Sequence, residues 1–160
     1  MVFTADDERW MREAIAVTRA GIAAGQTPFG CAIVRASGLV AASHNQVWAA
    51  GDPTAHAEVT AIRAATAKLG AIALTGCTLY STCEPCPMCM AAIHWARLER
   101  VVYGAAIADA AAAGFHELHL PAAELARLGG SPVAIEAGCL APECRALFAA
   151  WQAHGAARTY

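Results

Sequence analysis

Two short segments contain residues whose types and spacing fit a metal site. His56 and Glu58 lie two positions apart in "HAE", and Cys86 and Cys89 lie three apart in "PCPMC". Cysteines three apart on a helix share one face, and a helix N-terminus favours the negative charge of thiolates. One imidazole and two thiolates would give zinc three protein ligands and leave a fourth position for water. The spacing therefore predicts one zinc ion bound by His56, Cys86 and Cys89.

Glu58 is the candidate for proton transfer beside that metal. Residues two apart on a regular helix point in roughly opposite directions, so we expect Glu58 to stand next to the metal rather than to bind it with His56. The two side chains could still approach the same point if His56 lies in the looser first turn. A carboxylate beside zinc-bound water can take a proton from it and pass that proton on, so Glu58 is predicted to be catalytic.

Cys83 leaves an alternative open, because His56 with three cysteines could form a closed structural site. Two features disfavour it. Cys83 falls at a predicted strand end, before Glu84 and Pro85, and a closed site would leave Glu58 without a role. The open, catalytic form is favoured, and His-x-Glu followed by Pro-Cys-x-x-Cys is the pattern of the zinc deaminases that act on nucleobases.

The elements that must position these residues alternate between helices and strands. The segment 52–70 reads as a helix capped by Asp52 or Thr54, and the segment 85–98 as a second, nearly all-apolar helix. Residues 28–48 read as two strands around a turn at Ser37 and Gly38. Further helices are expected over 4–25, 108–115 and 141–155, and further strands over 76–82, 99–105 and 131–137. This order predicts an α/β fold with helices on the faces of a sheet.

Composition limits the cellular setting. The chain has 160 residues, a length typical of one domain, and 58% of them are hydrophobic. The net charge is −2, Lys68 is the only lysine and no basic stripe is visible, so nucleic acid is not an expected partner. The odd number of cysteines, the acidic start without a signal-peptide core and the short apolar stretches predict a reducing, cytoplasmic location without membrane contact.

The sequence resembles the cytidine deaminase superfamily, and within it most of all the bacterial guanine deaminase branch. The resemblance covers nearly the whole chain and is strongest in "DPTAHAEVTAIR", "CEPCPMC", "AIHWAR", "AAAAGF" and the final tyrosine. It implies one zinc-dependent deaminase domain over residues 1–160, with 150–160 as a C-terminal arm. It also implies a three-layer α/β/α fold with a five-stranded mixed sheet, and a homodimer.

Four further residues match positions that contact the base in the resembling family. Asn45 matches an asparagine that hydrogen-bonds the base, although a turn residue at a strand end is the alternative. Phe29 and Trp95 match positions near the base, and both could instead be core aromatics. Tyr160 matches a terminal tyrosine that reaches the partner subunit's site in that family; the alternative is a frayed chain end.

Glu117 is the second acid that the resemblance implies. Guanine deaminases have an acidic pair just after "GF", and its second member is thought to help proton transfer. Here the pair is His116 and Glu117. The second acid is kept as glutamate, while the histidine makes substrate identity an open question. A solvated surface loop is the alternative reading.

The reaction that the resemblance implies is zinc-dependent hydrolysis of guanine to xanthine and ammonia. Guanosine, cytosine or a triazine amine are alternative substrates, because specificity depends on pocket shape and on contacts to exocyclic groups. A tRNA adenosine deaminase is a closer alternative, since "DPTAHAE" and "AIEAGCLAPECRALF" resemble that branch too. Cys83 stands where such enzymes typically have leucine, and the tail lacks the lysines that RNA phosphates favour. The presence of Glu58 disfavours a non-catalytic zinc module.

Overall fold

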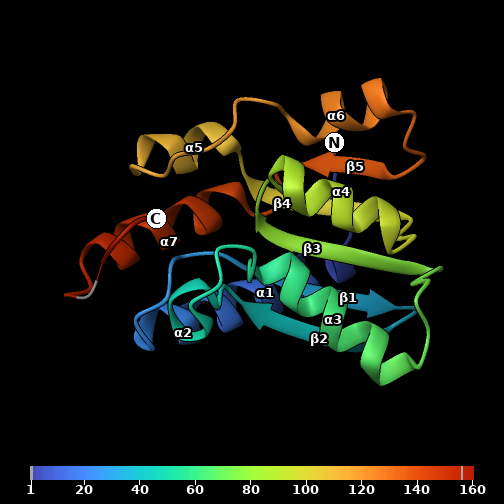
Figure 1. Ribbon diagram of the computed structural model, residues 1–160, viewed down its shortest axis with the longest axis horizontal. Helices are drawn as coiled ribbons and strands as arrows, with labels where there is room; N and C mark the ends of the chain where they lie inside the picture. The colour runs from blue at the N-terminus through green and yellow to red at the C-terminus, as the bar shows by residue number, and fades with distance from the viewer. Residues whose placement is uncertain (1, 156) are drawn as a thin grey trace.

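A five-stranded mixed sheet lies at the centre of the computed structural model, which describes residues 2–155 and 157–160 (Figure 1). The sheet order is β2-β1-β3-β4-β5. Strand β1 runs antiparallel to β2 and β3, whereas β3, β4 and β5 are parallel. The strands are β1 (Gly30–Arg35), β2 (Gly38–His44), β3 (Cys77–Cys83), β4 (Arg100–Ala105) and β5 (Ala134–Ala137). The predicted mixed sheet is confirmed.

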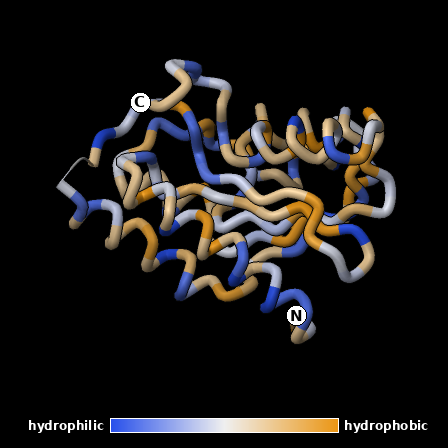
Figure 2. Tube along the Cα trace, turned by 90° about the horizontal axis from the view of Figure 1, so that it is seen from below, coloured by the Kyte–Doolittle hydropathy of each residue, from blue (hydrophilic) through white to orange (hydrophobic). Residues whose placement is uncertain are grey.

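Helices cover both faces of this sheet. They are α1 (Ala5–Ala23), α2 (Val47–Ala50), α3 (Ala57–Leu69), α4 (Pro87–Trp95), α5 (Ile107–Ala112), α6 (Ala122–Gly129) and α7 (Ala141–Gln152). One buried cluster joins α1 and α7 to the sheet through residues such as Met11 and Leu147. A second joins α3 and α4 through Ala61 and Ile93. Figure 2 shows the apolar strands between the helical layers. The three-layer α/β/α fold is confirmed.

Helix α3 begins five residues later than the sequence suggests. The Asp52 carboxylate accepts hydrogen bonds from the backbone N–H and the hydroxyl of Thr54, at 2.8 and 2.7 Å. These bonds stabilise a turn, because a short acidic side chain competes for nearby backbone groups outside a helix. Neither Asp52 nor Thr54 therefore caps the helix, and His56 occupies the N-cap position.

Other element boundaries also differ from the expectation. The β1–β2 turn lies at Ala36 and Ser37, with Ala36 at a positive φ of 52°, one residue before the predicted turn. Helices α2 and α6 were not predicted. Helix α7 continues to Gln152, so the C-terminal arm starts at 153 rather than 150. None of the described helices combines the length and apolar composition needed to cross a bilayer.

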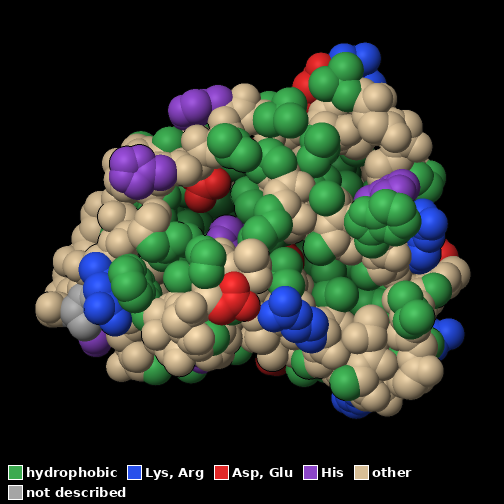
Figure 3. Space-filling view, viewed as in Figure 1, with side chains coloured by type: hydrophobic (Ala, Val, Ile, Leu, Met, Phe, Trp, Pro, Cys, Tyr) green, Lys and Arg blue, Asp and Glu red, His purple; other side chains and the backbone are tan. Residues whose placement is uncertain are grey.

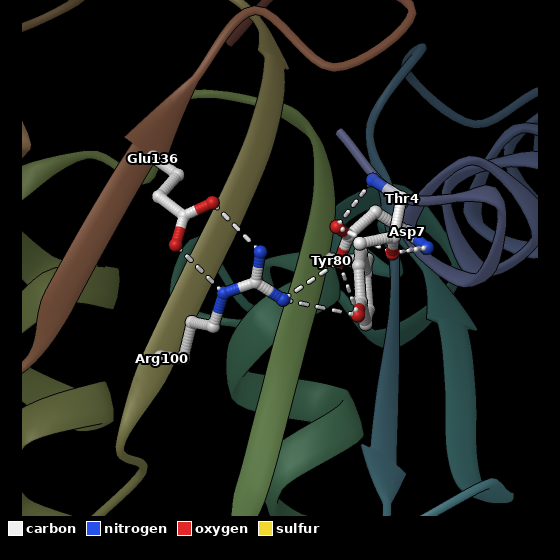
Figure 4. Close-up of polar contacts among 5 residues, drawn as sticks. All are labelled: Thr4, Asp7, Tyr80, Arg100 and Glu136. Carbon is white, nitrogen blue, oxygen red and sulfur yellow. Dashed lines mark hydrogen bonds and ion pairs between the residues drawn. The ribbon is translucent and has the colours of Figure 1, made fainter. Parts of the chain in front are cut away.

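A polar cluster fastens the start of α1 to the sheet (Figure 4). Thr4 and Asp7 form a capping box. The same Asp7 carboxylate accepts hydrogen bonds from Arg100 Nη1 at 2.6 Å and from the Tyr80 hydroxyl at 3.0 Å. Arg100 also pairs with Glu136 through two hydrogen bonds of 2.9 and 2.7 Å. One side chain of α1 is thus linked to β3, β4 and β5.

Candidate metal centre and base-binding cavity

His56 and Cys86 occupy equivalent positions, each immediately before a helix. His56 is the N-cap of α3 (φ −64°, ψ 157°), and Cys86 is the N-cap of α4 (φ −64°, ψ 166°). Both residues have extended backbone, so their side chains do not follow the helical spacing. Glu58 is the second residue of α3, and Cys89 is the third residue of α4, so both lie in the first turns of their helices. The extended conformation of His56 allows it and Glu58 to approach one point.

The three predicted ligands lie together. His56 Nδ1 is 3.7 Å from Cys86 Sγ and 3.5 Å from Cys89 Sγ, and the three ligand atoms are all within 4.8 Å of one another. In tetrahedral zinc sites, Zn–S distances of about 2.3 Å and Zn–N distances of about 2.0 Å separate the nitrogen and sulfur ligands by about 3.5 Å. The spacing of the three atoms fits zinc, and the predicted site of one zinc per chain is confirmed.

Cys83 does not complete a fourfold protein site. Its Sγ lies 3.6 Å from the Ala106 carbonyl oxygen, to which it can donate. Among the described residues, the group able to bind a metal contains His56, Cys86 and Cys89 but not Cys83. The structure therefore favours the open form of the site over the closed one.

Glu58 is buried directly beside these ligands. Its Oε1 accepts a hydrogen bond of 3.2 Å from the Ser81 hydroxyl, and its Oε2 lies 3.4 Å from Cys89 Sγ. Only 6% of the residue is exposed. Burial, followed by the charge of the nearby Cys86 thiolate, raises the pKa of Glu58. The raised pKa makes this buried carboxyl group easier to protonate, as a proton carrier requires.

The two ligand thiols differ in acidity. The hydrogen bond from Cys89 and the neighbouring His56 outweigh the effect of burial and lower the pKa of Cys86 to about 4. Cys89 donates the proton that it shares with Cys86 in this hydrogen bond. That donation, together with burial, raises the pKa of the Cys89 thiol. Burial opposes protonation of His56, but its contact with Cys86 raises the pKa of the imidazole. Zinc binding removes the shared proton, because coordinating thiols are deprotonated.

A cavity opens above the metal ligands. Its volume is about 180 Å³, and its lining includes His56, Cys86, Phe115, His116, Glu117 and Tyr160. A smaller pocket of about 20 Å³ continues inward to Phe29, Glu58 and Glu84. Figure 3 shows a hollow on this face of the molecule, with acidic and histidine side chains in it and at its rim. Phe29, His116 and Glu117 are thus brought to the site, and burial raises the pKa of Glu117.

Asn45 is hydrogen-bonded to Tyr160, which is one of the residues that line the cavity. The Asn45 side chain is buried, and its Nδ2 donates to the Tyr160 hydroxyl at 2.8 Å and to the Thr27 hydroxyl. The Tyr160 hydroxyl also lies 3.2 Å from His56 Nε2, the ring nitrogen that faces away from the cysteines. Such a contact orients a metal-binding imidazole. Tyr160 therefore reaches the site of its own chain in this single-chain structure. That the arm reaches a partner's site stays a prediction.

Residues 4–105 match the family model described as the cytidine and deoxycytidylate deaminase zinc-binding region. The chain belongs to the cytidine and deoxycytidylate deaminase family. Both ligand segments, with His56 and with Cys86 and Cys89, lie inside the matched region. This member of the family has the zinc-binding group and the fold that the resemblance implied.

Several relatives of this deaminase family are similar to the chain. A guanine deaminase of Bacillus subtilis is 49% identical over 111 residues, which cover 69% of this chain and 71% of the relative. A tRNA-specific adenosine deaminase of Aquifex aeolicus is 38% identical over 98 residues, which cover 61% of this chain and 65% of that one. A solved guanine deaminase from Nitrosomonas europaea has a TM-score of 0.85 at 32% identity and covers 96% of this chain and 87% of its own.

Solved structures of the same kind contain purine analogues. One is a complex with 8-azaguanine, with a TM-score of 0.85 at 32% identity, covering 92% of this chain and 84% of its own. Another is a complex with 2,6-diaminopurine, with a TM-score of 0.87 at 31% identity, covering 97% and 85%. Homologous structures thus bind nucleobase analogues.

Trp95 is a predicted site residue that lies away from the cavity of its own chain. It ends α4, it is 71% exposed, and it lies beside His94 and Arg97. Nine positions along a helix separate it from Cys86, so it points to a different part of the surface. A role for Trp95 in base binding stays a prediction, and within one chain the geometry does not support it.

Sequence reasoning missed the residues that hold the arm. Arg158 places its guanidinium carbon 3.8 Å from the centre of the Trp48 ring, and the Trp48 and Tyr160 rings meet edge to face at 6.2 Å. Phe115 lies between Phe29 and Tyr160, at 4.8 and 6.4 Å. The aromatic types of these residues were a weak signal, and only the fold shows that they meet.

Proposed function

We propose that this protein catalyses hydrolytic deamination of guanine to xanthine and ammonia. The position of Glu58 is the observation that carries the proposal, because a buried carboxylate beside three zinc ligands has the reach needed for proton transfer. The similarity to guanine deaminases, at 49% identity in the Bacillus subtilis enzyme, supports guanine as the base.

The side chains at the site divide the reaction between them. Zinc, when bound, supplies Lewis acidity that lowers the pKa of water and makes it a nucleophile near neutral pH. Glu58 accepts a proton from the attacking water and delivers it to a ring nitrogen as the carbon–oxygen bond forms at the amino-bearing carbon. Glu58 then takes the proton of the new hydroxyl group, and Glu58 or Glu117 protonates the amine. The carbonyl forms as the carbon–nitrogen bond breaks, and ammonia is released.

The cavity wall supports binding of a free base. Asn45 Oδ1 is buried and has no hydrogen-bond partner among the described residues, and an N–H group of a base that reached it would satisfy this acceptor. Tyr160 lines the cavity and Phe29 lines its inner pocket, so both offer aromatic surface. The volume of about 180 Å³ lies below the range of pockets for drug-sized ligands, which suits a single base.

We also propose a homodimer in a reducing, cytoplasmic setting. Trp95 and Leu128 are 71% and 63% exposed and lie near the ends of α4 and α6, where a second copy would cover them. All seven cysteines are free thiols, which supports a reducing compartment. A sedimentation mass of one 16.5 kDa chain, rather than two, would contradict the dimer.

Ammonia release is the direct test of the substrate. The zinc-loaded protein is offered guanine, guanosine, adenine, cytosine, a triazine amine and tRNA, each with and without prior removal of zinc by a chelator. We expect the highest kcat/KM with guanine and loss of release without zinc. Release from another amine with guanine inert would overturn the substrate but not the chemistry. Zinc binding without release from any amine would leave the non-catalytic zinc module.

A further inference from the structure

Glu84 connects the zinc-binding loop to two helices at once. It follows the last residue of β3 and lies two positions before Cys86, and only 8% of it is exposed. Its Oε2 accepts a hydrogen bond from Ile107 N at 3.1 Å, and its Oε1 accepts one from Ala122 N at 2.9 Å. Ile107 and Ala122 are the first residues of α5 and α6. Each oxygen of this one carboxylate therefore serves a different helix.

The contacts are favourable for both helices. The first N–H groups of a helix have no partner within it, and negative charge is stabilised at that end. The N-cap residues, Ala106 for α5 and Pro121 for α6, have no side-chain oxygen that could accept these bonds. Glu84 supplies the missing acceptor to both.

The chain between these two helices is the segment that bears Glu117. Residues 113–121 leave the end of α5, pass the cavity with Phe115 and Glu117, and return to the start of α6. Glu84 and Glu117 line the same small inner pocket with Glu58. Glu84 holds the helices on both sides of this segment, and it lies two residues before the zinc ligand Cys86. It therefore fixes the segment relative to the metal.

We propose that Glu84 is the positioning residue for Glu117. It sets the distance between Glu117 and the reacting amine by bonding the N-termini of α5 and α6 to the loop that contains Cys86. Its effect on turnover rests on the proposed function, whereas its effect on the segment 113–121 does not. Glu84 itself accepts no proton from substrate in this role.

Glu84→Gln separates the two bonds. An amide has one oxygen, so glutamine can accept from α5 or from α6, while its NH₂ group faces the other helix's N–H. Positioning errors near 1 Å can cost about 100-fold in rate, so we expect kcat to fall by about 10-fold or more, with KM changed less than about threefold. Zinc should remain at one ion per chain, because none of the three ligands is altered.

Glu99→Gln is the matched control. Glu99 Oε1 accepts a hydrogen bond of 2.9 Å from Gly76 N in an exposed position, so this variant also loses a carboxylate bond to a backbone N–H. Neither Glu99 nor Gly76 lines the cavity or its inner pocket. We expect Glu99→Gln to keep the kcat, KM and zinc content of the unaltered protein.

A double-mutant cycle with Glu117→Gln distinguishes positioning from general destabilisation. If Glu84 acts through Glu117, Glu84→Gln should reduce kcat much less when Glu117 is already glutamine. Equal fold losses in both backgrounds would overturn the proposal, and so would a Glu117→Gln variant with full activity.

Amide hydrogen exchange provides a readout that needs no substrate. Residues 113–121 should exchange faster in Glu84→Gln than in the unaltered protein or in Glu99→Gln, because one end of the segment is released. Unchanged exchange there would overturn the proposal. If the unaltered protein fails to deaminate guanine, the proposed function fails, and the exchange comparison still decides the role of Glu84.

Discussion

Glu58 and Glu117 line the same inner pocket from different elements of the fold. Glu58 lies in the first turn of α3 and is buried against Cys89, whereas Glu117 is half-buried in the segment after α5. Burial raises the pKa of both carboxyl groups. Two acids in these positions suit two different proton transfers, one near the attacking water and one near the departing amine.

Glu58→Gln should abolish turnover and spare the metal. Glutamine has nearly the same shape but cannot accept a proton, so we expect kcat to fall by at least about 100-fold. Zinc content by elemental analysis should stay at one per chain. Glu13→Gln, which alters an exposed glutamate on α1, is the control. Near-normal ammonia release by Glu58→Gln would remove Glu58 from the mechanism.

Glu117→Gln should reduce kcat by about 10-fold or more and change KM little, because general acid–base groups contribute at least this much. Steady-state ammonia release from guanine measures both constants. His119→Gln is the control, since His119 is exposed on the same segment. An unaffected kcat in Glu117→Gln would return Glu117 to the role of a surface-loop residue.

At the scale of residues, the metal centre could be predicted from the sequence, whereas the placement of some residues around it could not. The types and spacing of His56, Cys86 and Cys89 are dictated by zinc coordination, so they are visible in the sequence. The own-chain position of Tyr160 and the exposure of Trp95 depend on how the arm and α4 pack. Nothing in the neighbouring sequence determines either.

At the scale of elements, the C-terminal arm is held by stacked side chains. The Arg158 guanidinium lies over the Trp48 ring, and the backbone carbonyl of Arg158 is 3.4 Å from Trp48 Nε1. Tyr160 follows two residues later and enters the cavity. The contact between α2 and the arm therefore influences how often Tyr160 stands against Asn45.

Arg158→Ala should raise KM for guanine by about two- to fivefold, the effect expected from losing one exposed cation–π contact. The physical reason is that the closed arm would be populated less often, which weakens apparent binding in proportion. Arg145→Ala, on the exposed side of α7, is the control. An Arg158→Ala variant with unchanged KM would show that the stack does not hold the arm.

The sequence predicted the positions of the strands more accurately than the first residues of the helices. All five expected strands are present, because short β-branched and apolar runs between turn residues are typical of buried strands. Helix α3 starts late because Asp52 stabilises a turn with Thr54. Helix α6 was missed because its apolar face is short, although Pro121 and Gly130 bound it.

At the scale of the whole molecule, Asp7 makes folding sensitive to acid. Burial disfavours the charged form of Asp7, but the bonds from Arg100, Thr4 and Tyr80 outweigh burial and lower its pKa. A lowered pKa in the folded state stabilises the fold above the unfolded pKa of about 4. That stabilisation is lost as the pH falls through the lower, folded value.

Asp7→Asn should lower the free energy of unfolding at pH 7 by about 2 to 3 kcal/mol, the contribution of hydrogen bonds to charged groups. The difference in unfolding free energy between Asp7→Asn and the unaltered protein should become smaller below a pH of about 4. Urea unfolding at pH 7 and pH 3 measures both effects. Asp6→Asn, which alters an exposed acid in the same helical turn, is the control. A difference that stays constant between the two pH values would contradict this role.

The two N-cap ligands, His56 and Cys86, allow a bound ion to connect distant parts of the chain. His56 and Cys86 are thirty residues apart, and they come from helices that the chain connects only through β3. A bound ion therefore acts as a cross-link that closes a loop of about thirty residues, which by the chain-entropy relation for disulfides is worth about 3 to 4 kcal/mol. Where sulfur–sulfur bonds do not persist, a metal ion at a reaction centre can cross-link a chain in their place.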